Sequence, residues 1–290
     1  MKFWGVRGSI PTPGPATVYY GGNTSCVEIR ADGELIVLDA GTGIRPLGLS
    51  LAEEFKTEPI NLSVLLTHAH WDHIQGFPFF LPAYQAKNHL RVLGFEGARL
   101  GLASTLAGQM ESPYFPIGLN EMPGNIHIEE LQSFDFKIGS IHVQACATNH
   151  PGLAVGYRLT TSTGSIAYIP DNEPFTPAQT GSSPQISEAR NLKFIEFVHD
   201  TDVLIIDSQY DCEEYNAHIG WGHGCLDEVV KIAMAARVKH LFLFHHDPSH
   251  DDAKVNTMLA RARHLSTLAG SAMKINAARE GEEVLLDGKG

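Results

Sequence analysis

The stretch THAHWDH, residues 67–73, places three histidines and one aspartate within seven positions. Solvated imidazoles gain nothing from such proximity, whereas imidazole nitrogen and carboxylate oxygen are ligands for zinc, manganese or iron. His68 and His70 stand two positions apart at the end of an apolar run, so in extended chain their side chains point the same way. Asp72 and His73 follow where the chain turns into a helix. The motif therefore predicts one short loop that serves two metal ions.

The residues around the motif indicate that it lies inside the molecule. The apolar run at residues 61–67 is typical of a buried strand, and the equally apolar IQGFPFF, residues 74–80, follows the motif. The alternative is a polar surface loop. Apolar flanks on both sides favour the metal site.

Three later segments end predicted strands with further metal-binding residues. They are NHPG at residues 149–152, with His150; YIPDN at 168–172, with Asp171; and LFLFHHD at 241–247, with two histidines. A lone histidine at a strand end is more often structural, but the repeated placement at strand termini favours ligands. Alternation with Leu241 and Leu243 favours His245 over His246, although a strand covered on both faces weakens that argument.

Predicted strands cluster first in each half of the chain and are followed by alternating helices and strands. Strands are expected at residues 26–30, 35–39, 61–67, 141–145, 155–159, 165–169, 203–207 and 241–244, and helices at 47–55, 226–236 and 253–268. This order predicts an α/β fold with two facing sheets and helices outside, a four-layer αββα sandwich. We expect a single domain over residues 1–290.

Composition limits the classes of partner. The 290 residues carry a formal net charge of −12, which argues against a broad nucleic-acid surface. The four scattered cysteines indicate reduced thiols, and no leader or membrane-spanning run is recognisable. We therefore expect a cytoplasmic protein without a membrane partner. The aromatic segment around Tyr114 and Phe115 makes a homodimer plausible.

The chain resembles the metallo-β-lactamase-fold hydrolases, from LIVLDAGTG at residues 35–43 through the ligand motifs to His245. The resemblance implies one metal on His68, His70 and His150, a second on Asp72, His73 and His245, and Asp171 bridging them. The family's redox di-iron branch has glutamate where this chain has His70, which favours hydrolysis. True β-lactamases use cysteine near Asp171, so antibiotic hydrolysis is not expected.

A second motif points to the phosphodiesterase and ribonuclease Z-like branch. In WGHG, residues 221–224, His223 is similar to the histidine that contacts the substrate phosphate or donates a proton there. The alternative is a histidine that caps the following helix or supports the ligands. Near the N-terminus, Arg7 and Ser25 lie in glycine-rich loops resembling those of the same branch. Both are candidates to bind phosphate, with a structural turn equally open.

These observations predict a hydrolase with two divalent ions, zinc, manganese or iron, and with Asp72 and His223 as catalytic residues. Asp39 and Asp207 are candidates to orient the ligand imidazoles. A hydroxide held between the metals would attack the phosphorus of a small phosphodiester such as a cyclic nucleotide. Two rival activities are thioester, ester or lactone hydrolysis and RNA processing, and a third possibility is a metal sensor without turnover. The segment 94–139 is expected to be either a surface excursion or a wall of the substrate pocket.

Overall fold

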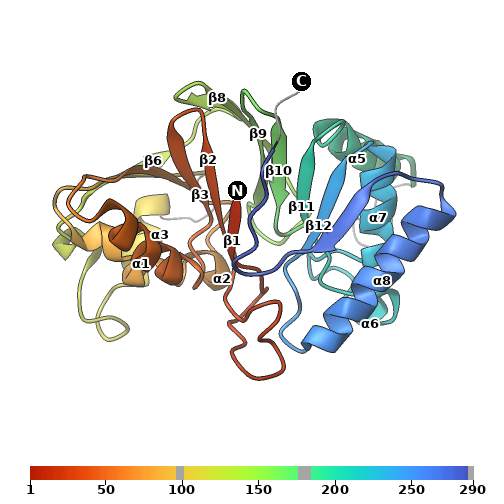
Figure 1. Ribbon diagram of the computed structural model, residues 1–290, viewed down its shortest axis with the longest axis horizontal. Coiled ribbons are helices and arrows are strands. Elements are labelled where there is room, and N and C mark those ends of the chain that lie inside the picture. Colours follow the sequence, from red (N-terminus) through yellow and green to blue (C-terminus); the bar gives the residue numbers. More distant parts are fainter. Residues whose placement is uncertain (96–100, 176–183, 287–290) are drawn as a thin grey trace.

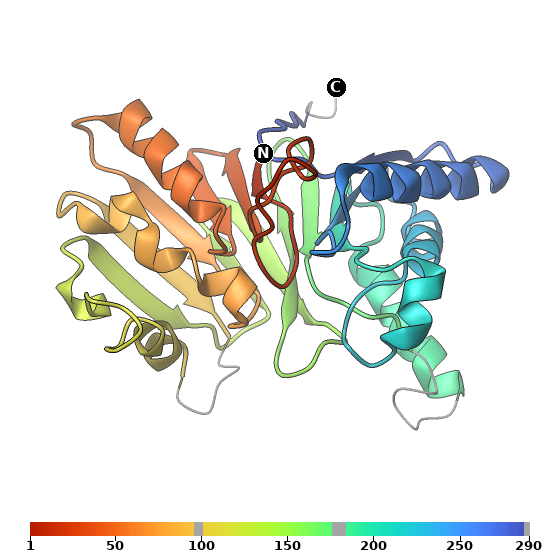
Figure 2. The ribbon, with the colours of Figure 1, turned by 90° about the horizontal axis from the view of Figure 1, so that it is seen from below.

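The computed structural model describes residues 1–95, 101–175 and 184–286. Two β-sheets face each other at the centre of the molecule, and helices cover the outer face of each (Figures 1 and 2). This arrangement confirms the predicted αββα sandwich.

The first sheet has six strands and contains the motif that opened the sequence. Its order is β1 (Lys2–Gly5), β2 (Cys26–Ala31), β3 (Glu34–Leu38), β4 (Asn61–Leu65), β5 (His89–Gly94), β6 (Asn125–Glu130). The first three strands are antiparallel and the last four parallel. The β2–β3 hairpin turns at Asp32 and Gly33, whose φ angles of 51° and 82° match the right-handed twist of the strands.

The second sheet has seven strands and supplies the remaining ligand motifs. Its order is β13 (Lys274–Ala277), β12 (His240–Phe244), β11 (Val203–Asp207), β10 (Ser165–Ile169), β9 (Val155–Thr160), β8 (Ile141–Ala147), β7 (Asp135–Ile138). Strands β10 to β13 are parallel, and every residue of β10 and β11 is buried. Both faces of these strands are covered, which explains their continuous apolar sequences.

Helices flank both sheets. The helical elements are α1 (Ile44–Phe55), α2 (Trp71–Ile74), η1 (Phe77–Phe79), η2 (Leu81–Tyr84), α3 (Leu102–Gly108), η3 (Leu119–Glu121), α5 (Pro184–Phe197), α6 (Cys212–Ala217), α7 (Leu226–Ala235) and α8 (Asp252–Leu268). One apolar cluster lies between the sheets, where the rings of Phe3 and Phe242 are 5.1 Å apart. A second packs the seven-stranded sheet against α5, α7 and α8, and a third packs the six-stranded sheet against α1, η1, η2 and α3. The described residues include no helix long and apolar enough to cross a membrane.

The expected elements differ from the structure mainly at their ends. Helix α1 begins at Ile44, three residues before the apolar periodicity indicated, and β4 ends at Leu65, before Thr67. The segment 94–139, apart from residues 96–100, which lie outside the described residues, contains α3, η3 and two edge strands, β6 and β7. Edge strands are half solvated and carry few apolar residues, so their sequences lack the signal of a buried strand.

Candidate metal centre

The predicted ligands, far apart in sequence, meet at one edge of the sandwich. His68 to His73 follow β4, His150 lies between β8 and β9, Asp171 follows β10, and His245 follows β12. Ends of parallel strands meet at the same sheet edge, which is why ligand motifs at strand termini converge. The structure forms one group from His68, His70, His150 and Asp171 and another from Asp72, His73 and His245, with ligand atoms within 4.8 Å of one another in each group.

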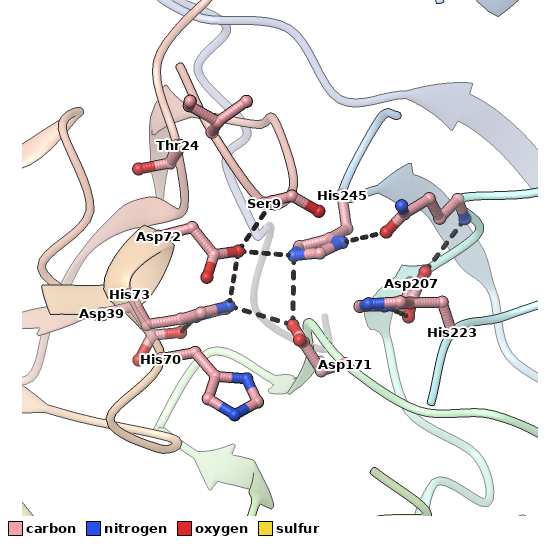
Figure 3. Close-up of polar contacts among 12 residues, drawn as sticks. Ser9, Thr24, Asp39, His70, Asp72, His73, Asp171, Asp207, His223 and His245 are labelled. Atoms are coloured by element: carbon pink, nitrogen blue, oxygen red, sulfur yellow. Dashed lines mark hydrogen bonds and ion pairs between the residues drawn. The ribbon is translucent and has the colours of Figure 1, made fainter. Parts of the chain in front are cut away.

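Asp171 lies between the two groups and divides its carboxylate oxygens between them. Its Oδ2 lies 3.6 Å from His68 Nε2 and 3.5 Å from His150 Nε2. Its Oδ1 lies 3.1 Å from His73 Nε2 and 3.3 Å from His245 Nε2 (Figure 3). This is the geometry of a bridging carboxylate.

The second group closes around Asp72. Its Oδ2 lies 3.2 Å from His73 Nε2 and 3.1 Å from His245 Nε2. The backbone N–H of Ser9 donates a hydrogen bond of 2.8 Å to the same oxygen (Figure 3). His246, the alternative to His245, has its Nε2 2.9 Å from the carbonyl oxygen of Ala278 and stands outside the group.

Buried polar atoms without a hydrogen-bond partner show that this donor set fits metal ions. Buried polar groups in proteins are almost always hydrogen-bonded. Here His68 Nε2, His73 Nε2 and Asp171 Oδ1 are all buried without a hydrogen bond. Because these atoms face the same small volume, two divalent cations would satisfy them together.

Other residues fix the orientation of the ligand imidazoles from behind. Asp39 Oδ2 lies 2.8 Å from His73 Nδ1 and accepts a hydrogen bond from the Tyr168 hydroxyl. Gln209 Oε1 lies 2.9 Å from His245 Nδ1. These contacts leave each Nε2 free for the metal and hold the ring in place. Asp39 therefore has the supporting place considered from the sequence, whereas nothing in the sequence singled out Gln209.

In the first ligand group, electrostatics favours the ionisation states that metal binding needs. Burial lowers the pKa of His68 and of His150, which keeps these imidazoles neutral. Burial alone would raise the pKa of Asp171, but His245, His73 and His68 hold it well below the usual range. The carboxylate is therefore ionised and the first-group imidazoles are unprotonated near neutral pH. In the second group, burial alone would lower the pKa of His73, but the carboxylates around it raise that pKa well above its ordinary value, so a metal ion there must displace a proton.

His223 lies beside the ligands. Its ring is stacked on that of His245 with centroids 5.0 Å apart, and its Nδ1 lies 2.9 Å from Asp207 Oδ2 (Figure 3). Burial alone would lower its pKa, but Asp207 raises it to about 9. It does not cap α7, whose N-cap is Cys225. Asp207 therefore orients His223. The sequence had made it a candidate to orient a metal-ligand imidazole.

Arg7 and Ser25, the two candidates for phosphate binding from the N-terminal loops, are both buried. The Arg7 guanidinium is buried and donates hydrogen bonds to the backbone carbonyls of Gly21, Asp247 and His250, so it ties the connection between β1 and β2 to the connection between β12 and α8. Ser25 Oγ is buried without a hydrogen-bond partner. The structure joins neither side chain to the ligand groups by a hydrogen bond, and their phosphate binding stays a prediction.

The segment 94–139 lies against the back of the first group. Phe95, Leu102 and Thr105 line a small cavity together with His68. Farther out, residues between Ala103 and Ile128 line a cavity of about 890 Å³. The described part of this segment thus forms an edge strand of each sheet and also lies beside the site. The sequence had left open whether it was a surface excursion or a wall of the pocket.

The histidines and aspartates that both sheets bring to one edge of the four-layer sandwich form groups consistent with a dinuclear metal site. The chain belongs to the beta-lactamase superfamily, because the family model of the beta-lactamase superfamily domain matches residues 35–246. With its two ligand groups, it is a metal-dependent hydrolase of this superfamily.

Several relatives carry the name ribonuclease Z. Ribonuclease Z of Picrophilus torridus is 22% identical over 91% of this chain and 90% of its own length. Ribonuclease Z of Thermoplasma acidophilum is 23% identical over 87% of this chain and 88% of its own.

Solved structures share the fold along nearly the whole chain. The metallo-beta-lactamase fold protein YhfI from Bacillus subtilis superposes with a TM-score of 0.69 at 17% identity, covering 97% of this chain and 96% of its own. Human tRNase Z, short form, superposes with a TM-score of 0.63 at 17% identity, covering 98% of both chains. A diphosphatase from the PhnP family superposes with a TM-score of 0.61 at 16% identity, covering 99% of this chain and 98% of its own.

Proposed function

We propose that the protein hydrolyses phosphodiesters. The observation that carries this proposal is His223, which lies on the ring of a predicted ligand and is held by a buried aspartate. An ester or thioester hydrolase with the same ligands gains less from a cation at this position, because its substrate is uncharged at the reacting group before attack. A phosphodiesterase needs one, because negative charge develops on the phosphoryl oxygens and on the leaving alkoxide.

The residues divide the work as follows. Two divalent ions, held by the two ligand groups, would supply a water of lowered pKa and neutralise phosphoryl charge. Asp171 sets the spacing of the two groups, and the Ser9 N–H orients Asp72. Because His223 Nδ1 is engaged with Asp207, its Nε2–H is the atom available to donate to a phosphoryl oxygen or to the leaving group.

Two substrate sizes are compatible with this chemistry. We favour a small diester such as a cyclic nucleotide, because the net charge of −12 opposes extended binding to a polyanion. The names of the relatives favour the second candidate, an RNA 3′-processing nuclease. Comparing kcat/KM for cyclic nucleotides and for a precursor tRNA at two salt concentrations separates them, since only the RNA should show a steep salt dependence.

The first test is hydrolysis of bis-p-nitrophenyl phosphate by protein stripped of metal and reloaded with zinc or manganese. We expect metal-dependent turnover that falls roughly 10²- to 10⁴-fold in His223→Ala, as is typical for loss of a general acid. The matched control is His142→Ala, a partly exposed histidine of β8 that pairs with Asp135 far from the ligands. Metal content is measured on every variant.

Either of two results would count against the proposal. Cleavage of a thioester or lactone with no phosphodiester turnover under either metal would assign the site to carbon-centred esters. Full activity of His223→Ala at unchanged metal content would remove the observation on which the proposal rests.

A further inference from the structure

Two exposed tryptophans lie in segments that adjoin the first ligand group. Trp71 lies between the ligands His70 and Asp72, and 74% of its surface is exposed. Trp221 is 59% exposed and precedes Gly222, whose carbonyl oxygen lies 2.9 Å from His150 Nδ1. Because His150 Nε2 is 3.0 Å from His70 Nδ1, the two indoles belong to segments that meet at the site.

The loop that carries Trp221 is held rigidly. The buried carboxylate of Glu173 accepts hydrogen bonds from the backbone N–H groups of Gly220 and Gly222, on both sides of the tryptophan. It also accepts one from the Tyr215 hydroxyl. A buried carboxylate that binds backbone amides fixes the loop strongly, since charge-assisted hydrogen bonds are about twice as strong as neutral ones.

Aromatic packing fixes the indole as well. The Trp221 ring meets His218 edge-on at 4.7 Å, and His218 is stacked on Tyr210 at 4.4 Å. Trp221 therefore presents a large apolar surface to solvent in a set position. Exposed aromatic surface that is held in place next to a reaction centre is typical of a binding site.

At Trp71 the backbone is what the surrounding structure fixes. Trp71 is the first residue of α2, and its neighbours Asp72 and His73 are buried ligands, so its backbone moves only with the metal centre. A polar residue would satisfy this solvent-facing position equally well. An indole there leaves a large apolar and aromatic surface open to solvent beside the ligands, where a bound group would cover it.

We propose that Trp71 and Trp221 bind the nucleobase of a nucleoside phosphodiester while its phosphate lies at the metal centre. This inference rests on the proposed phosphodiesterase function and narrows its substrate class. Every base has a π-face, so flat indoles beside the site accept any base without reading its identity.

A matched pair of substrates tests the proposal. Thymidine 5′-(p-nitrophenyl phosphate) and methyl p-nitrophenyl phosphate share a leaving group and differ in the nucleoside. We measure the ratio of their kcat/KM values for the wild-type protein, Trp71→Ala, Trp221→Ala and Trp221→Phe. Loss of one stacking contact should lower this ratio roughly 5- to 150-fold, mainly through KM of the nucleoside substrate, and Trp221→Phe should retain most of it.

Other outcomes overturn the inference in distinguishable ways. Equal losses on both substrates would mean that the tryptophans only maintain the loops. Unchanged kcat/KM values for both substrates in both alanine variants would mean that no base is bound there, with the phosphodiesterase activity still established. If the wild-type protein hydrolyses neither substrate with either metal, the proposed function fails and this inference fails with it.

Discussion

His223 shows how one side chain acquires a chemical role from its neighbours. An isolated histidine titrates near pH 6.5, so only a minority is protonated at neutral pH. Asp207 overcomes the effect of burial and raises the pKa of His223 to about 9. Asp207 itself is fully buried and accepts hydrogen bonds from the backbone N–H groups of Asn172 and Gln209. These contacts should keep a side chain at this position in place when its charge is removed.

Replacing Asp207 by asparagine should therefore shift the pH dependence of phosphodiester hydrolysis. Only a protonated His223 can donate its Nε2–H to the substrate, so activity is lost as the pH rises through the pKa of His223. Without the Asp207 charge that pKa falls, so the alkaline limb of the kcat/KM profile should move to lower pH. The measurement is a pH–rate profile of both proteins at matched metal content. An alkaline limb at the wild-type position would show that His223 is not the group that titrates.

At the scale of elements, α6 presents the loop that runs through residues 218–223. Asp211 caps this helix by accepting hydrogen bonds from the backbone N–H groups of Glu213 and Glu214. It also pairs with Lys254 of α8, with 2.6 Å between Oδ2 and Nζ. Burial alone would raise the pKa of Asp211, but Lys254 and the cap hydrogen bonds lower it below its ordinary value. One carboxylate thus joins α6 to α8.

Asp211→Ala should lower the free energy of unfolding by about 1 kcal/mol, the usual cost of losing a helix cap. A carboxyl whose pKa is depressed by folding stabilises above its unfolded pKa, so the loss should be present at pH 7 and shrink as the pH falls below about 4. Urea unfolding at both pH values measures it. Asp211→Ser keeps a capping oxygen and should recover most of the stability, since the exposed ion pair contributes little. Equal stability of all three proteins at pH 7 would contradict the assignment.

At the scale of the molecule, the metal centre connects the two sheets. His68 to His73 follow a strand of the six-stranded sheet, whereas His150, Asp171 and His245 follow strands of the seven-stranded sheet. The carboxylate of Asp171 touches imidazoles from both sheets. Bound cations would therefore cross-link the halves of the sandwich at one edge.

Removal of metal should lower the melting temperature, and zinc or manganese should restore it. A ligand at 100 times its Kd stabilises the native state by about 2.7 kcal/mol per site. Thermal unfolding with and without chelator measures the difference. Asp171→Asn should reduce the response to added metal, while His142→Ala should respond like the wild-type protein. A melting temperature indifferent to chelator and metal would contradict a cross-linking centre.

The sequence alone determined the αββα architecture and the candidate ligands. Buried strands read as continuous apolar runs, and ligands at their ends must converge, so local pattern carries this information. Sequence likewise singled out His223 and Asp39, each next to a recognisable strand or helix.

Only the tertiary structure decided which partner each side chain meets. Strand alternation favoured His245 over His246 without deciding between them, and the structure decides where the chain leaves β12, with a left-handed φ of 60° at His245 and with His246 turned to the carbonyl oxygen of Ala278. Arg7 has its guanidinium among carbonyls of loops up to 243 positions away. Glu173 and Gln209 support the site through contacts between separate loops. Such long-range contacts arise from how the two sheets pack, and local sequence carries no trace of them.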